Sequence, residues 1–146
     1  MSHRTAAFIA LVGGGIFLMS RAVGANVLSG GKLSPSQIGV LASNAGFSGG
    51  DLITAVAIAL AESGGDPNAH GDLTLPGSGS YGLWQIYAHA HPEFGPDFTQ
   101  LYDPAINAAA AFSVYSAAGN SFSPWSTFKG GQYEAHLDVA SQSVNV

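Results

Sequence analysis

An almost uninterrupted apolar run covers residues 52–61, where a single threonine breaks a series of leucine, isoleucine, valine and alanine. A helix that is apolar on every side is typical of the buried centre of a domain. Asp51 precedes the run in an N-cap position, and Gly-Gly-Asp-Pro at 64–67 stops a helix. The pattern therefore predicts a buried central helix from Leu52 to Ser63.

Two more helices are predicted, one on each side of this run. Ser-Pro-Ser-Gln at 34–37 provides an N-cap, a proline at the first helical position and a capping box, and Gly46 ends this helix. Asp-Pro at 103–104 opens the other helix, and Gly119 stops it. The first of the two carries one apolar face, made of Ile38, Leu41, Ala42 and Ala45.

The remaining segments are less regular. Residues 66–81 are rich in Gly, Pro, Asn and Ser, which predicts a long loop with a small hairpin around residues 72–75. Residues 82–90 are a candidate for a short helix, and a final short helix is predicted over 133–142. Helices predominate, so the sequence predicts a single mainly α domain over residues 33–146.

The start of the chain has a different pattern. Residues 5–20 carry no charge and lie between Arg4 and Arg21. At about 1.5 Å per residue a helix over them would span about 24 Å, less than the roughly 30 Å hydrocarbon core of a bilayer. Extension through residues 22–28, with Arg21 reaching toward the interface, would make up the difference.

Two interpretations of this tract fit the sequence. The first is a retained hydrophobic or transmembrane helix over residues 1–28, followed by a linker at 29–32. The second is a cleaved secretory signal, because a basic start and an apolar stretch precede small residues that end at Ala25. The leading expectation is the anchor, with residues 5–28 in a membrane or a hydrophobic assembly.

Charge and cysteine content narrow the functional classes. The 146-residue chain has a net charge of −5, and all nine acidic residues lie from Asp51 onward against Lys129 alone. Such an acidic body does not suit nucleic acid, whose phosphates attract basic surfaces. The chain has no cysteine and therefore no disulfide. His89 and His91 would lie on different faces of a helix, so we expect neither a metal site nor a cofactor.

The central helix ends on a carboxylate. Glu62 lies in the predicted last turn, where the negative end of the helix dipole and the apolar neighbours both disfavour an ionised group. Both effects raise the pKa of Glu62, and a carboxyl group that keeps its proton near neutral pH suits general acid catalysis. A glutamate that simply points into water is the competing interpretation.

The segment Gly-Ser-Tyr-Gly-Leu-Trp-Gln-Ile at 79–86 adds features of a sugar-binding site. It combines the side-chain amide of Gln85, the flat ring of Tyr81, and glycines that leave backbone groups open. Amides bind hydroxyl and acetamide groups, and aromatic rings pack on the apolar faces of sugars. Trp84 in the same segment is more typical of a core residue.

Four segments, AESGG, SYGLWQI, DPAINAAAAF and PWSTFKGGQY, resemble in order and spacing the lysozyme-like domain of soluble lytic transglycosylases. The resemblance covers roughly residues 50–133 and implies that Glu62 is the sole catalytic acid/base. It also implies a sugar cleft lined by Ser80 and Gln85. The aromatic residues of these segments complete the predicted substrate contacts, namely Tyr81, Phe128 and Tyr133.

One motif departs from the family pattern. Many members carry Ala-Tyr-Asn-x-Gly, whose tyrosine touches the sugar near the acid, whereas this chain has Ser-Thr-Phe-Lys-Gly-Gly at 126–131. Phe128 stands in the place of that tyrosine, so its hydroxyl is missing. A non-catalytic module that is structural or binds peptidoglycan is therefore an alternative to an enzyme.

The resemblance implies cleavage of the β-1,4 bond between N-acetylmuramic acid and N-acetylglucosamine in peptidoglycan, with a 1,6-anhydro product. Hydrolysis by the same fold, as in goose-type lysozymes, needs a group that activates water, usually a second carboxylate. Asp72 is the candidate, because Asp66 in Gly-Asp-Pro-Asn is typical of a turn. The expected setting is the periplasmic side of a bacterial envelope or a phage virion.

Overall fold

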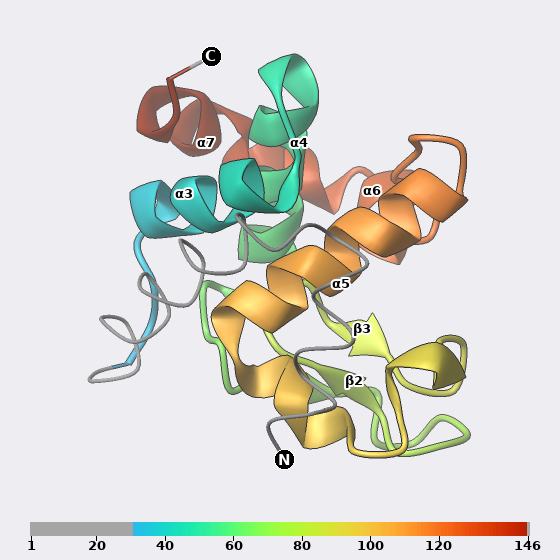
Figure 1. Cartoon of the computed structure of the whole chain (residues 1–146). Coiled ribbons are helices and arrows are strands. Elements are labelled where there is room, and N and C mark those ends of the chain that lie inside the picture. Colours follow the sequence, from blue (N-terminus) through green and yellow to red (C-terminus); the bar gives the residue numbers. More distant parts are fainter. Residues whose placement is uncertain (1–30, 146) are drawn as a thin grey trace.

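The computed structural model describes residues 31–145, which form a mainly helical domain with a small three-stranded sheet (Figure 1). The apolar tract over residues 1–28 lies outside the described residues. The α-helices are α3 (Pro35–Ala45), α4 (Gly49–Ser63), α5 (Pro104–Ala117), α6 (Ser126–Lys129) and α7 (Leu137–Ser143). Short 3-10 helices are η1 (Pro92–Phe94), η2 (Phe98–Tyr102) and η3 (Gln132–His136). The prediction of a mainly α domain is confirmed.

Helix α3 begins as its sequence predicts. The backbone N–H of Gln37 donates to Ser34 Oγ (3.2 Å), and the backbone N–H of Ser34 donates to Gln37 Oε1 (2.9 Å). These two bonds complete a capping box, and Pro35 takes the first helical position. The predicted apolar face is buried in the core, at Ile38, Leu41, Ala42 and Ala45.

The central helix α4 ends at Ser63, as predicted, but it begins at Gly49 rather than at Leu52. Asp51 is therefore not the N-cap. It lies within the first turn, and its carboxylate accepts a hydrogen bond from the hydroxyl of Tyr115 on α5. That bond, reinforced by burial, raises the pKa of Tyr115 to about 12. The sequence pattern predicted that the Asp51 carboxylate caps the helix, but in the structure it binds Tyr115 on another helix.

The small sheet consists of β1 (His70–Gly71), β2 (Ser80–Tyr81) and β3 (Ile86–Tyr87), paired antiparallel in this order. His70 is opposite Tyr81 in the first pair, and Tyr81 is opposite Ile86 in the second. β1 and β2 enclose residues 72–79, so the hairpin predicted in this loop is confirmed. In the view of Figure 1, β2 and β3 lie below α5, and α3, α4 and α7 lie above it.

The prediction of a short helix over residues 82–90 is wrong. This stretch forms a turn followed by β3. Gly82 has a φ of 77° and Gln85 a φ of 47°, values that a right-handed helix excludes. The backbone N–H of Trp84 donates to Oδ1 of Asn107 on α5 (2.9 Å) rather than to a helical carbonyl. A partner far away in the sequence has replaced the local hydrogen bond of a helix.

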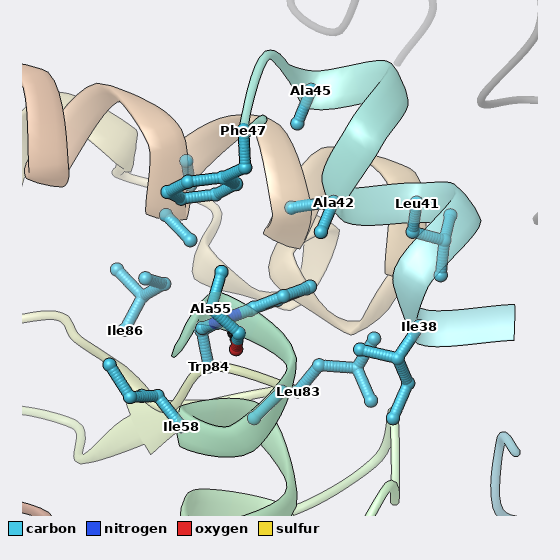
Figure 2. Close-up of a cluster of buried hydrophobic side chains, with 14 of the residues drawn as sticks. Ile38, Leu41, Ala42, Ala45, Phe47, Ala55, Ile58, Leu83, Trp84 and Ile86 are labelled. Atoms are coloured by element: carbon cyan, nitrogen blue, oxygen red, sulfur yellow. Dashed lines mark hydrogen bonds between the residues drawn. The ribbon is translucent and has the colours of Figure 1, made fainter. Parts of the chain in front are cut away.

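The core packs around Trp84, which is fully buried as predicted (Figure 2). The Trp84 indole N–H donates to the carbonyl of Ala55 on α4 (2.9 Å). In Figure 2, Trp84 and Ala55 lie among the side chains of α3, Ile58 and Ile86. The segment Ser-Tyr-Gly-Leu-Trp-Gln-Ile at 80–86, called the second motif from here on, is thereby attached to the helix that carries Glu62.

The final predicted helix, over residues 133–142, is present as two consecutive elements. The 3-10 helix η3 comes first, and α7 follows it directly. Both elements pack against α4. Across residues 31–145, no helix combines the length and the apolar character that crossing a membrane requires.

Replacing Asp103 with alanine is expected to lower the free energy of unfolding by about 1.5 kcal/mol. Asp103 Oδ1 accepts the N–H groups of Ala105 (2.9 Å) and Ile106 (3.2 Å), which lack helical partners at the start of α5. Urea denaturation measures the loss. Asp97→Ala is the matched control, because Asp97 caps only the short η2 through the N–H of Thr99. Equal losses in the two variants would contradict the prediction.

Candidate active site

Glu62 lies in the last turn of α4, directly before the residues that end the helix. Gly64 adopts a left-handed conformation (φ 61°), and its N–H donates to the carbonyl of Leu60 (2.9 Å). Glu62 is partly buried, and desolvation by burial is the largest cause of its raised pKa. The raised pKa predicted from the sequence is therefore present.

Thr127, which the sequence analysis did not single out, is the hydrogen-bond partner of Glu62. Thr127 Oγ1 donates to Glu62 Oε1 at 2.7 Å. This bond favours the ionised carboxylate and lowers the pKa of Glu62, against the larger effect of burial. Thr127 lies on α6, immediately before Phe128, in the segment 126–131 that stands in the place of the family's Ala-Tyr-Asn-x-Gly motif. Its hydroxyl within that motif was the signal available in the sequence.

Asp72 acts on Glu62 from the hairpin. The negative charge of Asp72 raises the pKa of Glu62, so the two carboxyl groups lie within electrostatic range. Asp72 has a left-handed backbone (φ 57°), and its Oδ2 accepts a hydrogen bond from Ser80 Oγ at 2.5 Å. Ser80 is only 1% exposed, so its hydroxyl holds Asp72 instead of facing an open sugar site. The charge of the predicted second carboxylate therefore acts on the predicted acid.

Gln85, whose amide was predicted to bind sugar, uses that amide within the protein. Its Nε2 donates to the carbonyls of Ala69 (3.1 Å) and Gly82 (3.0 Å). These bonds hold the turn between β2 and β3 against the residue that precedes β1. Gln85 therefore supports the hairpin that carries Asp72.

The predicted aromatic contacts fall into two groups. Tyr81 is buried and stacks on His70 in the sheet, with 4.5 Å between the ring centroids. Phe128 and Tyr133 are partly buried, with 4.9 Å between their ring centroids. They lie on α6 and η3, which both pack against α4. Tyr81 therefore belongs to the hairpin, whereas the other two belong to the elements on α4 near Thr127.

Two buried side chains that the sequence analysis missed hold the second motif in place. Asn107 Nδ2 donates to the carbonyls of Tyr81 (2.8 Å) and Leu101 (2.9 Å). Trp125 Nε1 donates to the carbonyl of Trp84 (2.8 Å). Since Trp125 directly precedes α6, its bond links the second motif to the helix that contacts the acid.

Other polar features of the domain lie apart from Glu62. Within residues 31–145, no group of three or more His, Cys, Asp or Glu side chains is placed to hold a metal ion. His91 Nδ1 and Glu93 Oε1 form an ion pair at 3.1 Å when the histidine is protonated. A hollow of about 480 Å³ adjoins these two residues and the C-terminal half of α5. Glu62 and its partners do not line this hollow, so it is not part of the site.

The fold and the site define a protein of the lysozyme-like class, with a partly buried glutamate at the end of the central helix and a hairpin whose Asp72 acts on it electrostatically. The family model described as "Lysozyme like domain" matches residues 40–127, a range that includes Glu62, Asp72 and Thr127. The chain belongs to this family. Comparisons with curated proteins and with solved structures give no match. Family membership supports a glycan-cleaving activity in general.

Proposed function

We propose that this protein is a peptidoglycan lytic transglycosylase, which cleaves the β-1,4 bond between N-acetylmuramic acid and N-acetylglucosamine with a 1,6-anhydro product. The supporting observation is Glu62, a carboxyl group whose pKa is raised by burial and whose ionised form is stabilised by the hydrogen bond from Thr127. A residue that acts first as an acid and then as a base must reach both protonation states. Membership of a lysozyme-like family agrees with this reaction.

The proposed reaction has two steps. Protonated Glu62 donates its proton to the glycosidic oxygen while the bond from that oxygen to muramoyl C1 breaks, and an oxocarbenium-like charge develops on the ring. The glucosaminyl chain leaves with a new hydroxyl group. Ionised Glu62 then accepts the proton of the muramoyl 6-hydroxyl, whose oxygen bonds to C1. Glu62 ends the cycle protonated, and no water is consumed.

Hydrolysis of the same bond, as in a lysozyme, is the second candidate, and Asp72 favours it. The charge of Asp72 acts on Glu62, and Ser80 holds the Asp72 carboxylate at 2.5 Å. A second carboxylate in such a site can activate water, which then attacks C1 in place of the 6-hydroxyl. Both reactions begin with the same proton transfer from Glu62, and they differ in the nucleophile.

Replacing Asp72 with asparagine is expected to keep cleavage within about tenfold of the wild-type rate if the 6-hydroxyl is the nucleophile. The amide removes the negative charge that raises the pKa of Glu62, so this pKa falls. The alkaline limb of the pH–rate profile, where Glu62 loses its proton, therefore moves to lower pH. The measurement is the initial rate of glycan cleavage against pH.

Asp66→Asn is the matched control for this variant. Asp66 accepts the N–H of Asn68 (2.9 Å) in a turn, and it does not contribute to the pKa of Glu62. Its pH–rate profile should coincide with that of the wild type. A loss of about 10²-fold or more in the Asp72 variant alone would contradict transglycosylation and identify Asp72 as the group that activates water.

The experiment that tests the proposed function is a digestion of purified peptidoglycan with the full chain, followed by mass spectrometry of the products. Muropeptides that end in 1,6-anhydro-muramic acid support the transglycosylase. Reducing ends that are heavier by one water identify a lysozyme instead. Binding of intact glycan with no cleavage, under conditions where a known muralytic enzyme is active, would favour a non-catalytic module.

We also propose that residues 5–28 attach the domain to a membrane or to a hydrophobic assembly, at the periplasmic side of an envelope or in a virion. The uncharged tract between Arg4 and Arg21 supports this attachment. Co-sedimentation with phosphatidylethanolamine–phosphatidylglycerol vesicles tests it, beside a chain that begins at residue 29. A full chain that stays in the supernatant would contradict membrane attachment.

A further inference from the structure

We propose that Thr127 is a positioning residue for Glu62, whose hydroxyl holds the carboxyl group in one orientation and stabilises it after its proton has left. The inference rests on the proposed role of Glu62 as the acid and base. Its geometric basis is the 2.7 Å hydrogen bond from Thr127 Oγ1 to Glu62 Oε1, which joins residues 65 positions apart in the sequence.

The hydrogen bond distinguishes the two oxygens of the Glu62 carboxyl group. Oε1 accepts the Thr127 hydroxyl, so Oε2 is the oxygen left to carry the transferable proton. A glutamate side chain that is free to rotate would present either oxygen to the substrate in changing directions. Fixing the rotamer keeps the donor oxygen in one place, which is the main requirement for proton transfer within hydrogen-bond reach.

Thr127 is itself held firmly, although its helix α6 has only four residues. The backbone N–H groups of Phe128 and Lys129 both donate to the carbonyl of Trp125 (3.2 Å each). The Trp125 side chain is buried and bonded to the second motif. The Phe128 ring packs on that of Tyr133 on η3. The position of the threonine is therefore set by the core and not by the short helix alone.

Among the groups that shift the pKa of Glu62, Thr127 is the one that favours the ionised form of the carboxyl group. Asp72 on the hairpin carries a negative charge that opposes ionisation. The elements that pack against α4, and the segment that leads into α3, carry the other charged or titratable groups, namely Lys32, Lys129, Tyr133, Glu134, His136 and Asp138. Within residues 31–145, no cation forms an ion pair with Glu62. Without the threonine hydroxyl, burial and Asp72 would both act against the carboxylate.

This balance matters for the second step of the proposed reaction. After proton donation, Glu62 must persist as a carboxylate long enough to accept the proton of the muramoyl 6-hydroxyl. A hydrogen bond from a hydroxyl to a carboxylate is shorter and stronger than one between neutral groups. The bond from Thr127 therefore stabilises the ionised form of Glu62 selectively. The Thr127 side chain therefore assists Glu62 without contacting the reacting atoms itself.

Thr127→Val tests the proposal, because valine keeps the branched shape of threonine and lacks the hydroxyl. The titration of the Glu62 carboxyl carbon is followed by NMR in the full chain, and kcat and KM are measured on peptidoglycan fragments. We expect the pKa of Glu62 to rise, kcat to fall about tenfold and KM to stay unchanged. Thr127→Ser, which restores the hydroxyl, should return both the pKa and kcat toward the wild-type values.

Ser126→Ala is the matched control, since Ser126 is the exposed neighbour on the same short helix. It should leave the titration of Glu62 and the value of kcat unchanged. An unchanged pKa of Glu62 in Thr127→Val, with the fold intact by circular dichroism, would overturn the proposal. The proposal would also be overturned if Thr127→Ser behaved like the valine variant.

The NMR titration also separates this proposal from the proposed function. If Thr127→Val raises the pKa of Glu62 and the serine variant restores it, the threonine controls the carboxyl group whatever the substrate is. If the wild type then cleaves no glycan, the proposed function fails while the assignment of Thr127 to Glu62 is supported. If the wild type cleaves glycan and the valine variant is fully active, the role of Thr127 in the reaction is excluded.

Discussion

Replacing Glu62 with glutamine is expected to reduce the rate of glycan cleavage by about 10³-fold or more, because general acid–base catalysis typically contributes 10²–10⁴ and here one residue serves both steps. Glutamine has nearly the same shape and still accepts the Thr127 hydroxyl, but it carries no transferable proton. The initial rate of release of soluble muropeptides is the measurement. A residual activity above about one tenth of the wild type would contradict the assignment of Glu62 as the acid.

The same variant has an expected effect on stability, with a sign that follows from the raised pKa. The folded chain binds the Glu62 proton more tightly than the unfolded chain, so wild-type stability falls as pH rises from the ordinary value of 4.5 through the raised pKa. Glutamine has no charge and escapes this loss. Thermal unfolding of Glu62→Gln should therefore have a higher midpoint than the wild type near neutral pH, and the difference should vanish in acid.

This stability measurement is also the control for the activity result. An inactive variant that unfolds at a lower temperature than the wild type near neutral pH would be inactive because its fold is damaged. An inactive variant that is as stable as the wild type, or more stable, has lost the proton transfer by Glu62 and has kept its fold. The second outcome is the one that we expect.

Replacing Gly82 with alanine is expected to lower the free energy of unfolding by about 4 kcal/mol. Gly82 has a φ of 77°, which strains any residue with a Cβ. A Cβ at this position would also lie 2.3 Å from Asn107 Nδ2 and 2.4 Å from the carbonyl oxygen of Leu101. Asn107 is fully buried and makes three hydrogen bonds, two to the second motif and one to the carbonyl of Leu101, so it has no room to move without breaking them.

Gly119→Ala is the matched control, because Gly119 has nearly the same φ of 76° and no atom within 4 Å of its added Cβ. This variant introduces the backbone strain without the clash. Its free energy of unfolding should fall by about 1–2 kcal/mol. Urea denaturation of both variants gives the difference. If Gly82→Ala does not fold at all, its soluble yield beside that of the Gly119 variant gives the same ranking. Equal costs would show that the second motif is not packed tightly against Asn107.

The features that the sequence predicted correctly depend on residues close to one another along the chain. The capping box at Ser34 and Gln37 and the cap at Asp103 each involve residues within three positions of one another. Such signals act through local backbone geometry, so their outcome hardly depends on the rest of the fold. The raised pKa of Glu62 was expected because an apolar helix precedes it, although the burial that causes the shift comes from the rest of the fold.

The predictions that failed are those where a distant partner replaced a local one. Asp51 was predicted to cap α4, but the hydroxyl of Tyr115, 64 positions away, binds its carboxylate. Residues 82–90 were predicted to be helical, but Asn107 accepts the N–H of Trp84 and the chain turns instead. Local propensity is a weak guide wherever a buried polar group offers a better hydrogen bond.

By itself, the sequence determined the mainly helical class, the buried central helix and the placement of Glu62 at its end. Only the tertiary structure decided what surrounds that carboxyl group. Thr127 donates to it from 65 positions away, and Asp72 acts on it from a hairpin that Ser80 and Gln85 hold in shape. A helix and its caps are set by contacts between neighbours in the chain, whereas the protonation of Glu62 depends on burial and charges that folding alone brings together.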